Sequence, residues 1–213
     1  MSPRLEAIGL ECVRGERMLF RNLNCRVEAG EMLRIDGDNG AGKTSLLKIL
    51  CGLSRPESGE VRWGGAPIAR DRFAYCRELT YLGHRAALKA DLTAAENLDA
   101  AAALAARAPA IAAANALREM ALDDCLRLPC RLLSAGQRQR VALAGLLMRP
   151  GGVWILDEPA AALDSSAIAR LEQMLAAQTA VGGIVVFTSH QPLALNHARA
   201  HSLHRPQCAA DTR

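Results

Sequence analysis

The sequence has no apolar run long enough to cross a membrane and no secretory leader. Its long apolar stretch, residues 98–117, is interrupted by Asp99, Arg107, Pro109 and Asn115, whereas a spanning helix needs about 20 continuous apolar residues. The amino-terminal segment MSPRLEAIGLECVRGER lacks the apolar core of a signal peptide. We therefore expect no membrane span and no secretion, so a role at a membrane would require docking onto the helices of other subunits.

Paired cysteines and a strong net charge are also missing. The seven cysteines, an odd number, are scattered and form no CxxC pair, which argues against a disulfide framework. We expect buried thiols in a reducing compartment. The net charge of +4 is too small to indicate nucleic-acid binding by itself, and we predict no nucleic-acid partner.

No internal repeat or low-complexity linker divides the 213 residues. A chain of this length buries about 70% of its unfolded surface as one generous domain. We predict a single domain over residues 1–205, with a helical subdomain at about 84–149, and a loose tail over residues 206–213.

Apolar runs predict the order of the elements. A helical pattern covers about 84–149, where Pro109 predicts a break and a second helix would carry Ile111, Leu117 and Met120. Two apolar strands flanking a helix at about 166–178 predict a parallel sheet with right-handed crossovers. The predicted strands are residues 5–10, 25–27, 32–35, 61–63, 79–82, 153–156 and 184–187. His197, His201 and His204 could line one side of a terminal helix, for which we favour a solvated helix over a metal site.

The segment after residues 32–35 matches the GxxxxGK[ST] pattern of phosphate-binding loops. Glycines let backbone N–H groups surround phosphates, and the start of the following helix adds a positive dipole. Lys43 would reach the β- and γ-phosphates of a nucleotide, and Thr44 would bind Mg²⁺. The predicted nucleotide-binding residues are Gly37, Asp38, Asn39, Gly40, Ala41, Gly42, Lys43 and Thr44.

The strand predicted at 153–156 runs directly into two acids, Asp157 and Glu158. Carboxylates at the end of a buried strand can face the phosphates held by the loop. Asp157 would hold Mg²⁺ through water, and Glu158 would polarise the attacking water. The sequence therefore predicts phosphoryl transfer to water.

Three further motifs complete a pattern that resembles the ATP-binding cassettes of ABC transporters over nearly the whole chain. LSAGQ at 133–137 is similar to the signature motif, Ala162-Leu163-Asp164 to the D-loop, and His190 to the switch histidine. Taken alone, LSAGQ would also fit an N-cap serine before a helix. The signature residues are Leu133, Ser134, Ala135, Gly136 and Gln137.

The resemblance implies an α/β P-loop NTPase fold with a mainly parallel core sheet, an antiparallel β subdomain and a helical subdomain. It further implies an ATPase that works as a homodimer. Ser134 and Gly136 would then bind the γ-phosphate of an ATP held by the second subunit, while His190 would contact that phosphate in its own subunit.

Two positions depart from the cassette pattern. His84 stands where the Q-loop glutamine is expected, and Val13-Arg14 stands where an aromatic residue would stack on adenine. The guanidinium plane of Arg14 could stack on the base instead. We therefore hypothesise weak base discrimination, for which equal turnover of ATP and GTP would be the supporting result.

Several phrases resemble one branch of the family, the ATP-binding export subunits of cytochrome c maturation. They include YLGH at 81–84, LLSAGQRQRVALA at 132–144 and TSHQPL at 188–193. This resemblance implies ATP hydrolysis at the cytoplasmic face of the bacterial inner membrane, in a complex with integral membrane subunits. The hydrolysis would drive haem export or release of a haem-loaded periplasmic chaperone. A cassette that serves an exporter of another cargo is the alternative, and a soluble ABC ATPase acting on nucleic acid fits less well.

Overall fold

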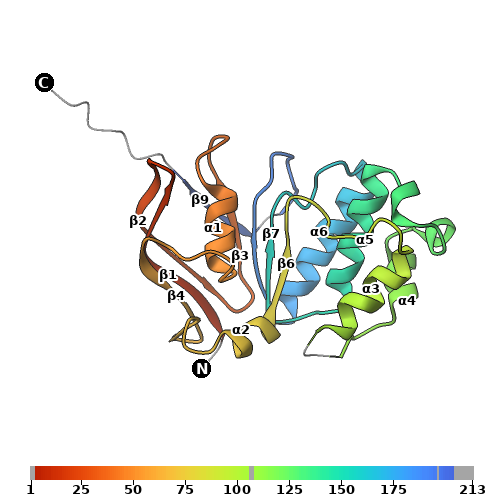
Figure 1. Cartoon of the computed structure of the whole chain (residues 1–213), viewed down its shortest axis with the longest axis horizontal. Helices are drawn as coiled ribbons and strands as arrows, with labels where there is room; N and C mark the ends of the chain where they lie inside the picture. Colours follow the sequence, from red (N-terminus) through yellow and green to blue (C-terminus); the bar gives the residue numbers. More distant parts are fainter. Residues whose placement is uncertain (1–2, 106–107, 196, 204–213) are drawn as a thin grey trace, which may run out of the picture.

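Two β-sheets organise the computed structural model, which describes residues 3–105, 108–195 and 197–203. The first sheet is antiparallel, in the order β2 (Arg17–Glu28), β1 (Arg4–Arg14), β4 (Ser58–Trp63) and β5 (Ala66–Pro67). The second is parallel, in the order β6 (Leu79–Leu82), β7 (Val153–Leu156), β8 (Ile184–Phe187), β3 (Met32–Asp36) and β9 (Ala198–Ser202). The predicted combination of a parallel core sheet with an antiparallel β part is confirmed (Figure 1).

The parallel sheet is covered on both faces because its central strands are apolar throughout. In β7, Val153 and Ile155 belong to one core cluster, whereas Trp154 and Leu156 belong to the other. Alternate residues of a strand point to opposite faces, so this four-residue strand contributes to both clusters. All four side chains are buried.

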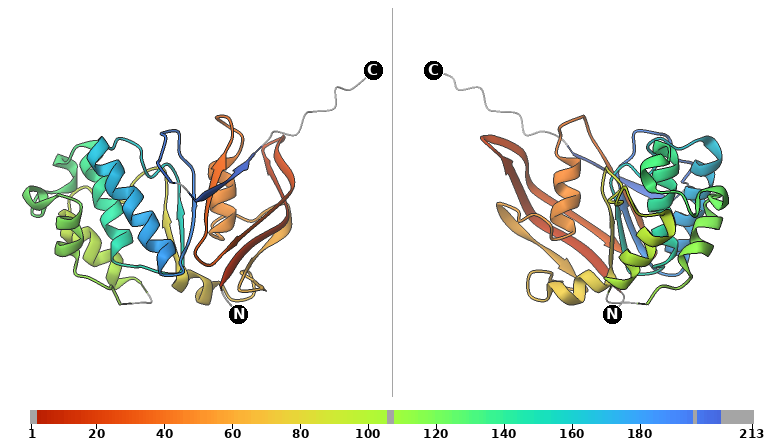
Figure 2. Two further views of the ribbon diagram at one scale, coloured as in Figure 1. Left: turned by 180° about the vertical axis from the view of Figure 1, so that it is seen from behind. Right: turned by 45° about the vertical axis from the view of Figure 1, so that its right-hand side comes forward.

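Four helices pack against one face of the parallel sheet, and helix α1 and the antiparallel sheet pack against the other. One core cluster joins the sheet to α3 (Ala94–Ala103), α4 (Ala113–Glu119), α5 (Ala135–Leu147) and α6 (Ser165–Ala180). The other joins it to α1 (Lys43–Leu50) and the antiparallel sheet. Figure 2 shows these two groups on opposite sides of the parallel strands. The short helix α2 (Arg72–Glu78) leads into β6, and two short 3-10 turns, Asp123–Cys125 and Cys130–Leu132, precede α5.

The expected terminal helix is wrong. Residues 198–202 form strand β9, in which His201 pairs with Ile35 of β3. The backbone of β3 would otherwise lack a hydrogen-bonding neighbour on that side, and this long-range pairing overrides the helical spacing of the histidines. His204 and the tail predicted from Pro206 lie outside the described residues.

The second predicted helix of the helical region is shorter than expected. Helix α4 begins after Ala112 and ends before Met120, so Ile111 and Met120 flank it. Both still pack against the core, which explains why the apolar pattern extends beyond the helix. Within the described part of the chain, no helix is long and apolar enough to span a membrane.

We expected buried thiols, and four of the six described cysteines are buried. Cys12, Cys51, Cys125 and Cys130 are buried, but Cys25 is half-buried and Cys76 is exposed. Burial raises the pKa of the Cys25 thiol to about 11, so this thiol stays protonated at neutral pH. Cys208 lies outside the described residues.

Candidate nucleotide-binding site

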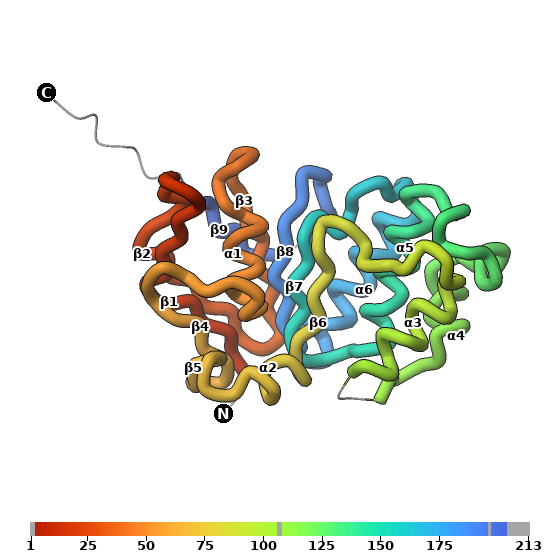
Figure 3. The backbone as a smooth tube through the Cα atoms, in the orientation of Figure 1, coloured from red at the N-terminus to blue at the C-terminus, as the bar shows by residue number. Residues whose placement is uncertain are grey.

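A cleft of about 440 Å³ lies at the edge where the parallel strands β3, β7 and β8 end. In the backbone trace of Figure 3, the chain leaves these strands at the same edge. The cleft brings together most of the phosphate loop, both predicted acids, the switch histidine and the Q-loop position. Its lining residues are Leu19, Asp38, Asn39, Gly40, Gly42, Lys43, Thr44, Ser45, His84, Asp157, Glu158 and His190.

The phosphate loop connects β3 to α1 as the sequence predicts. Gly42 caps α1 with φ of 102°, a backbone conformation that only glycine adopts without strain. The side chains of Leu19 and Phe20 lie against the same residue, where they would contact any added Cβ. The Lys43 ammonium donates to the carbonyl oxygen of Gly37 at 2.5 Å, which holds it over the loop. Backbone N–H groups and a lysine charge are thus positioned for an anion.

The two residues predicted to serve Mg²⁺ contact each other across 113 positions of sequence. The Thr44 hydroxyl donates to Oδ2 of Asp157 at 2.8 Å. Asp157 is buried, whereas Thr44 is exposed at the cleft. Hard oxygen donors of this kind are the ligands that Mg²⁺ prefers, so the residues present fit the ion.

Glu158 and His190 are in contact in the same cleft. The backbone N–H of His190 donates to Oε2 of Glu158 at 2.9 Å, and its ring Nε2 lies 3.5 Å from Oε1. Oε1 is buried and has no hydrogen-bond partner in the described part of the chain. Glu158 also has a positive φ of 54°, a strained conformation for glutamate. A carboxylate with spare acceptor capacity is what a general base requires.

Of the two residues that depart from the cassette pattern, His84 lines the cleft and Arg14 does not. His84 is exposed after β6 and lines the cleft, and its Q-loop role stays a prediction. Arg14 is not part of that lining, and its guanidinium donates to the Ser54 hydroxyl at 3.2 Å. Stacking of Arg14 on a base stays a prediction.

The segment LSAGQ begins helix α5 with a capping box. The Ser134 hydroxyl accepts from the backbone N–H of Gln137 at 3.1 Å, and the Gln137 side chain accepts from the backbone N–H of Ser134 at 2.8 Å. Ser134 is therefore the N-cap of α5, as the alternative interpretation of LSAGQ predicts. Ser134 remains exposed, at the positive end of the helix dipole.

Comparisons with known proteins agree with this geometry. The model of the ABC transporter family matches residues 20–161, which include the phosphate loop, LSAGQ and the two acids. The chain belongs to the ABC transporter family. A cytochrome c biogenesis ATP-binding export protein CcmA from Nitrosococcus oceani is 48% identical, covering 92% of this chain and 90% of the relative. The protein of that name from Aromatoleum aromaticum is 50% identical, with coverage of 89% and 90%.

Solved ABC structures have the same fold. An ABC transporter ATP-binding protein from Pyrococcus furiosus superposes with a TM-score of 0.80 at 26% identity, covering 94% of this chain and 98% of that one. An ATP-binding cassette in a dimeric post-hydrolysis state, bound to ADP and Pi, superposes with a TM-score of 0.79 at 26% identity. Coverage there is 93% of this chain and 94% of that one.

The ABC signature does not reach the cleft of its own chain. None of residues 133–137 is among the described residues that line the cleft. Helices α1 and α5 lie on opposite sides of strands β6, β7 and β8 (Figure 1). The signature residues therefore lie outside the cleft that holds the phosphate loop of the same chain.

The signature instead packs on the D-loop. A Cβ added to Gly136 would lie 2.6 Å from the carbonyl oxygen of Ala162, so only glycine allows this approach. Ala162 has a positive φ of 59°. Asp164 follows as the N-cap of α6, where its carboxylate accepts from the backbone N–H of Ala167 at 2.8 Å. The ABC motifs at 133–137 and 162–164 thus form one unit.

Three residues in or behind the cleft were not predicted. Leu19 and Ser45 line it, and buried Thr188 lies behind it, bonded to the side chain of Asp157 at 2.9 Å. Leu19 follows the β1–β2 turn, so the sequence gives no sign that it approaches the loop. The sequence did carry a signal for Thr188, because it is a polar residue directly after an apolar strand and two positions before His190.

Proposed function

We propose that this chain is the ATP-hydrolysing subunit of a bacterial inner-membrane ABC complex for cytochrome c biogenesis. The observation that carries the proposal is the cleft itself, which gathers the phosphate loop, both acids and His190 from distant parts of the chain. The branch of the family is supported by relatives at 46–50% identity that are named as cytochrome c biogenesis ATP-binding export proteins. In that complex, hydrolysis would drive haem export or release of a haem-loaded periplasmic chaperone.

The motif residues that line the cleft divide the proposed hydrolysis among them. Backbone N–H groups of residues 37–44 and the Lys43 ammonium hold the phosphates. Thr44 and Asp157 would hold Mg²⁺, which would offset the negative charge of the phosphates. Glu158 polarises the attacking water, and His190 contacts the γ-phosphate. His84 lines the same cleft at the position where the Q-loop glutamine is expected.

The second half of the ATP site comes from another copy of the chain. Ser134 and Gly136 are proposed to bind the γ-phosphate held by the partner, because the signature is remote from its own cleft and exposes a helix amino terminus. Such a terminus is suited to anions. Two ATP molecules would then be enclosed in a homodimer, and hydrolysis at Glu158 would reopen it.

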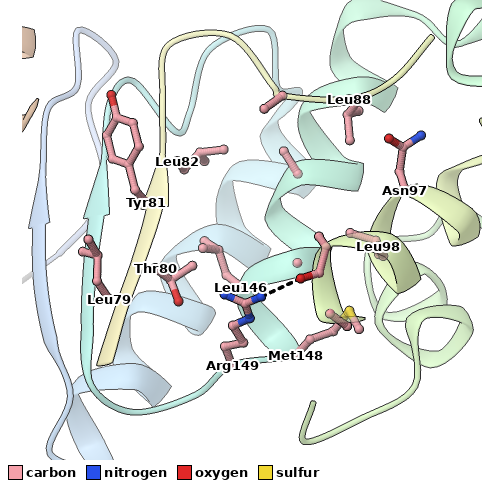
Figure 4. Close-up of a pocket in the computed structure, with 15 residues that line it drawn as sticks. Leu79, Thr80, Tyr81, Leu82, Leu88, Asn97, Leu98, Leu146, Met148 and Arg149 are labelled. Atoms are coloured by element: carbon pink, nitrogen blue, oxygen red, sulfur yellow. Dashed lines mark hydrogen bonds between the residues drawn. The ribbon is translucent and has the colours of Figure 1, made fainter. Parts of the chain in front are cut away.

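Integral membrane subunits would dock on the helical subdomain, which we assign to about residues 84–149. An apolar pocket of about 220 Å³ supports this placement (Figure 4). Leu88 and Leu98 line it opposite strand β6, and the guanidinium of Arg149 crosses it to the carbonyl oxygen of Ala101 at 2.9 Å. The segment from His84 to Asn97 contributes both to this pocket and to the nucleotide cleft. Docking here would place the chain at the cytoplasmic face of the membrane.

The proposal is tested by purifying the tagged chain from membranes and identifying its partners by mass spectrometry. We expect integral membrane subunits that handle haem. Deletion of the gene should abolish covalent haem attachment to c-type cytochromes. Wild-type protein should restore it and Lys43→Ala should not. Partners specific to another cargo, together with normal c-type cytochromes in the deletion strain, would overturn the assignment.

A further inference from the structure

The hydroxyl of Thr188 connects the two acids of the cleft. Thr188 follows β8, and none of its surface is exposed. Its Oγ1 accepts from the backbone N–H of Glu158 at 2.9 Å and donates to Oδ1 of Asp157 at 2.9 Å. Its own backbone N–H donates to the carbonyl oxygen of Leu156 at 3.0 Å, which extends the β7–β8 pairing by one residue.

This single hydroxyl is hydrogen-bonded to both acids. The Asp157 side chain accepts one hydrogen bond at each carboxylate oxygen, from Thr44 at the cleft and from Thr188 behind it. Two residues after the end of β7, Glu158 has a strained backbone of positive φ, and the bond to Thr188 satisfies its N–H there. A hydroxyl can accept and donate at once. Valine would fill the same volume and do neither.

We propose that Thr188 is a positioning residue, which sets the orientation of the Asp157 carboxylate toward Mg²⁺ and of Glu158 toward the attacking water. This inference rests on the proposed roles of Asp157 and Glu158. Thr188 does not line the cleft, so it acts only through these neighbours. Outer-shell partners of metal-binding carboxylates act in this way.

The test compares Thr188→Val, which removes the hydroxyl at constant volume, with Thr188→Ser, which retains it. Thr179→Val is the matched control, because the Thr179 hydroxyl donates within helix α6 to the carbonyl oxygen of Ala176 at 3.0 Å, away from the cleft. Two quantities are measured. One is kcat and KM for ATP in the complex purified from membranes. The other is the gain in affinity of the purified chain for a fluorescent ATP analogue when Mg²⁺ is added.

Loss of an outer-shell partner should lower kcat about tenfold, and KM for ATP in the presence of Mg²⁺ should rise as the affinity for the Mg²⁺ complex falls. The Mg²⁺-dependent gain in affinity should fall by about the same factor, and affinity without Mg²⁺ should not change. Thr188→Ser and Thr179→Val should resemble the wild type in both measurements. If Thr188→Val does not fold, Thr188→Ala takes its place with the same expectations.

Wild-type values for Thr188→Val would overturn the proposal. Equal impairment of Thr188→Ser and Thr188→Val would also overturn it, because packing rather than the hydroxyl would then be responsible. Glu158→Gln is assayed in parallel. If Glu158→Gln retains wild-type turnover, the proposed role of Glu158 itself fails, whereas loss of turnover there with a normal Thr188→Val refutes the inference about Thr188 alone.

Discussion

Glu158 combines a strained backbone with a carboxylate that is held by a hydrogen bond. Its φ is 54°, yet its carboxylate accepts from the backbone N–H of His190. In Glu158→Gln the amide oxygen can still accept this bond, but the residue can no longer act as a base. We expect ATP binding to persist and turnover in the assembled complex to fall by about 10² or more, with a dimer that ATP stabilises. Phosphate release and light scattering with ATP measure these effects, and wild-type hydrolysis would contradict the assignment.

Lys43 is held where a phosphate would meet it, by the carbonyl oxygens of Gly37 at 2.5 Å and Asp38 at 3.4 Å. Lys43→Ala removes the charge from the loop and should abolish binding of a fluorescent ATP analogue. Lys48 supplies the control, because it lies in the last turn of the same helix and is exposed. We expect Lys48→Ala to bind like the wild type. Equal affinities of both variants would show that the loop does not use Lys43.

At the scale of elements, local pattern predicted the strands and failed where pairing is non-local. The runs at 153–156 and 184–187 became β7 and β8 because their apolar residues suit a strand buried on both faces. His201 lies in β9 because β3 offers it a backbone partner more than 160 residues earlier in the chain, which no local window contains. The same limit applies to the site. The loop and acids were predictable from motifs, but the bond from Thr44 to Asp157 and the bridge at Thr188 depend on how the elements pack.

Helix α6 depends on its cap, which leads to a pH-dependent prediction. The backbone N–H of Ala167 and the Ser166 hydroxyl donate to Asp164 and hold the pKa of its carboxyl below the usual value. The ionised cap therefore stabilises the fold above the unfolded pKa of about 4, and this contribution is lost as pH falls through the lower folded pKa. Asp164→Ala should have a lower Tm than the wild type at neutral pH, with a difference that disappears only in acid.

Asn is an N-cap about as good as Asp and carries no charge. Asp164→Asn should therefore remain close to the wild type at neutral pH, and relative to Asp164→Ala it should keep its advantage in acid. Thermal melts from about pH 7 downward measure all three proteins. A difference between Asp164→Ala and the wild type that grows as pH falls would contradict the role of the ionised cap.

At the scale of the whole molecule, the parallel sheet lies between the helix that follows the signature and the helix that follows the phosphate loop, and residues 133–137 are not among the described residues that line the nucleotide cleft. The motifs indicated a shared site from the family resemblance. What the structure adds is a direct contact between the signature and the D-loop. Gly136 lies against Ala162, and Asp164 then starts α6, so movement of the signature on ATP binding would be transmitted directly to the D-loop.

Sharing of the site can be tested by mixing two inactive variants. Lys43→Ala disables the phosphate loop, and Ser134→Asp retains the helix cap but places a carboxylate where the γ-phosphate of the partner would bind. In a mixed dimer, the intact loop of the Ser134→Asp chain faces the intact signature of the Lys43→Ala chain. Random pairing then restores about a quarter of the wild-type sites, although each variant alone is inactive. Ser134→Asn, which caps the helix without a charge, should stay active by itself. If the signature served its own chain, every dimer in the mixture would contain only damaged sites, and phosphate release by the co-expressed complex would stay at the level of the single variants.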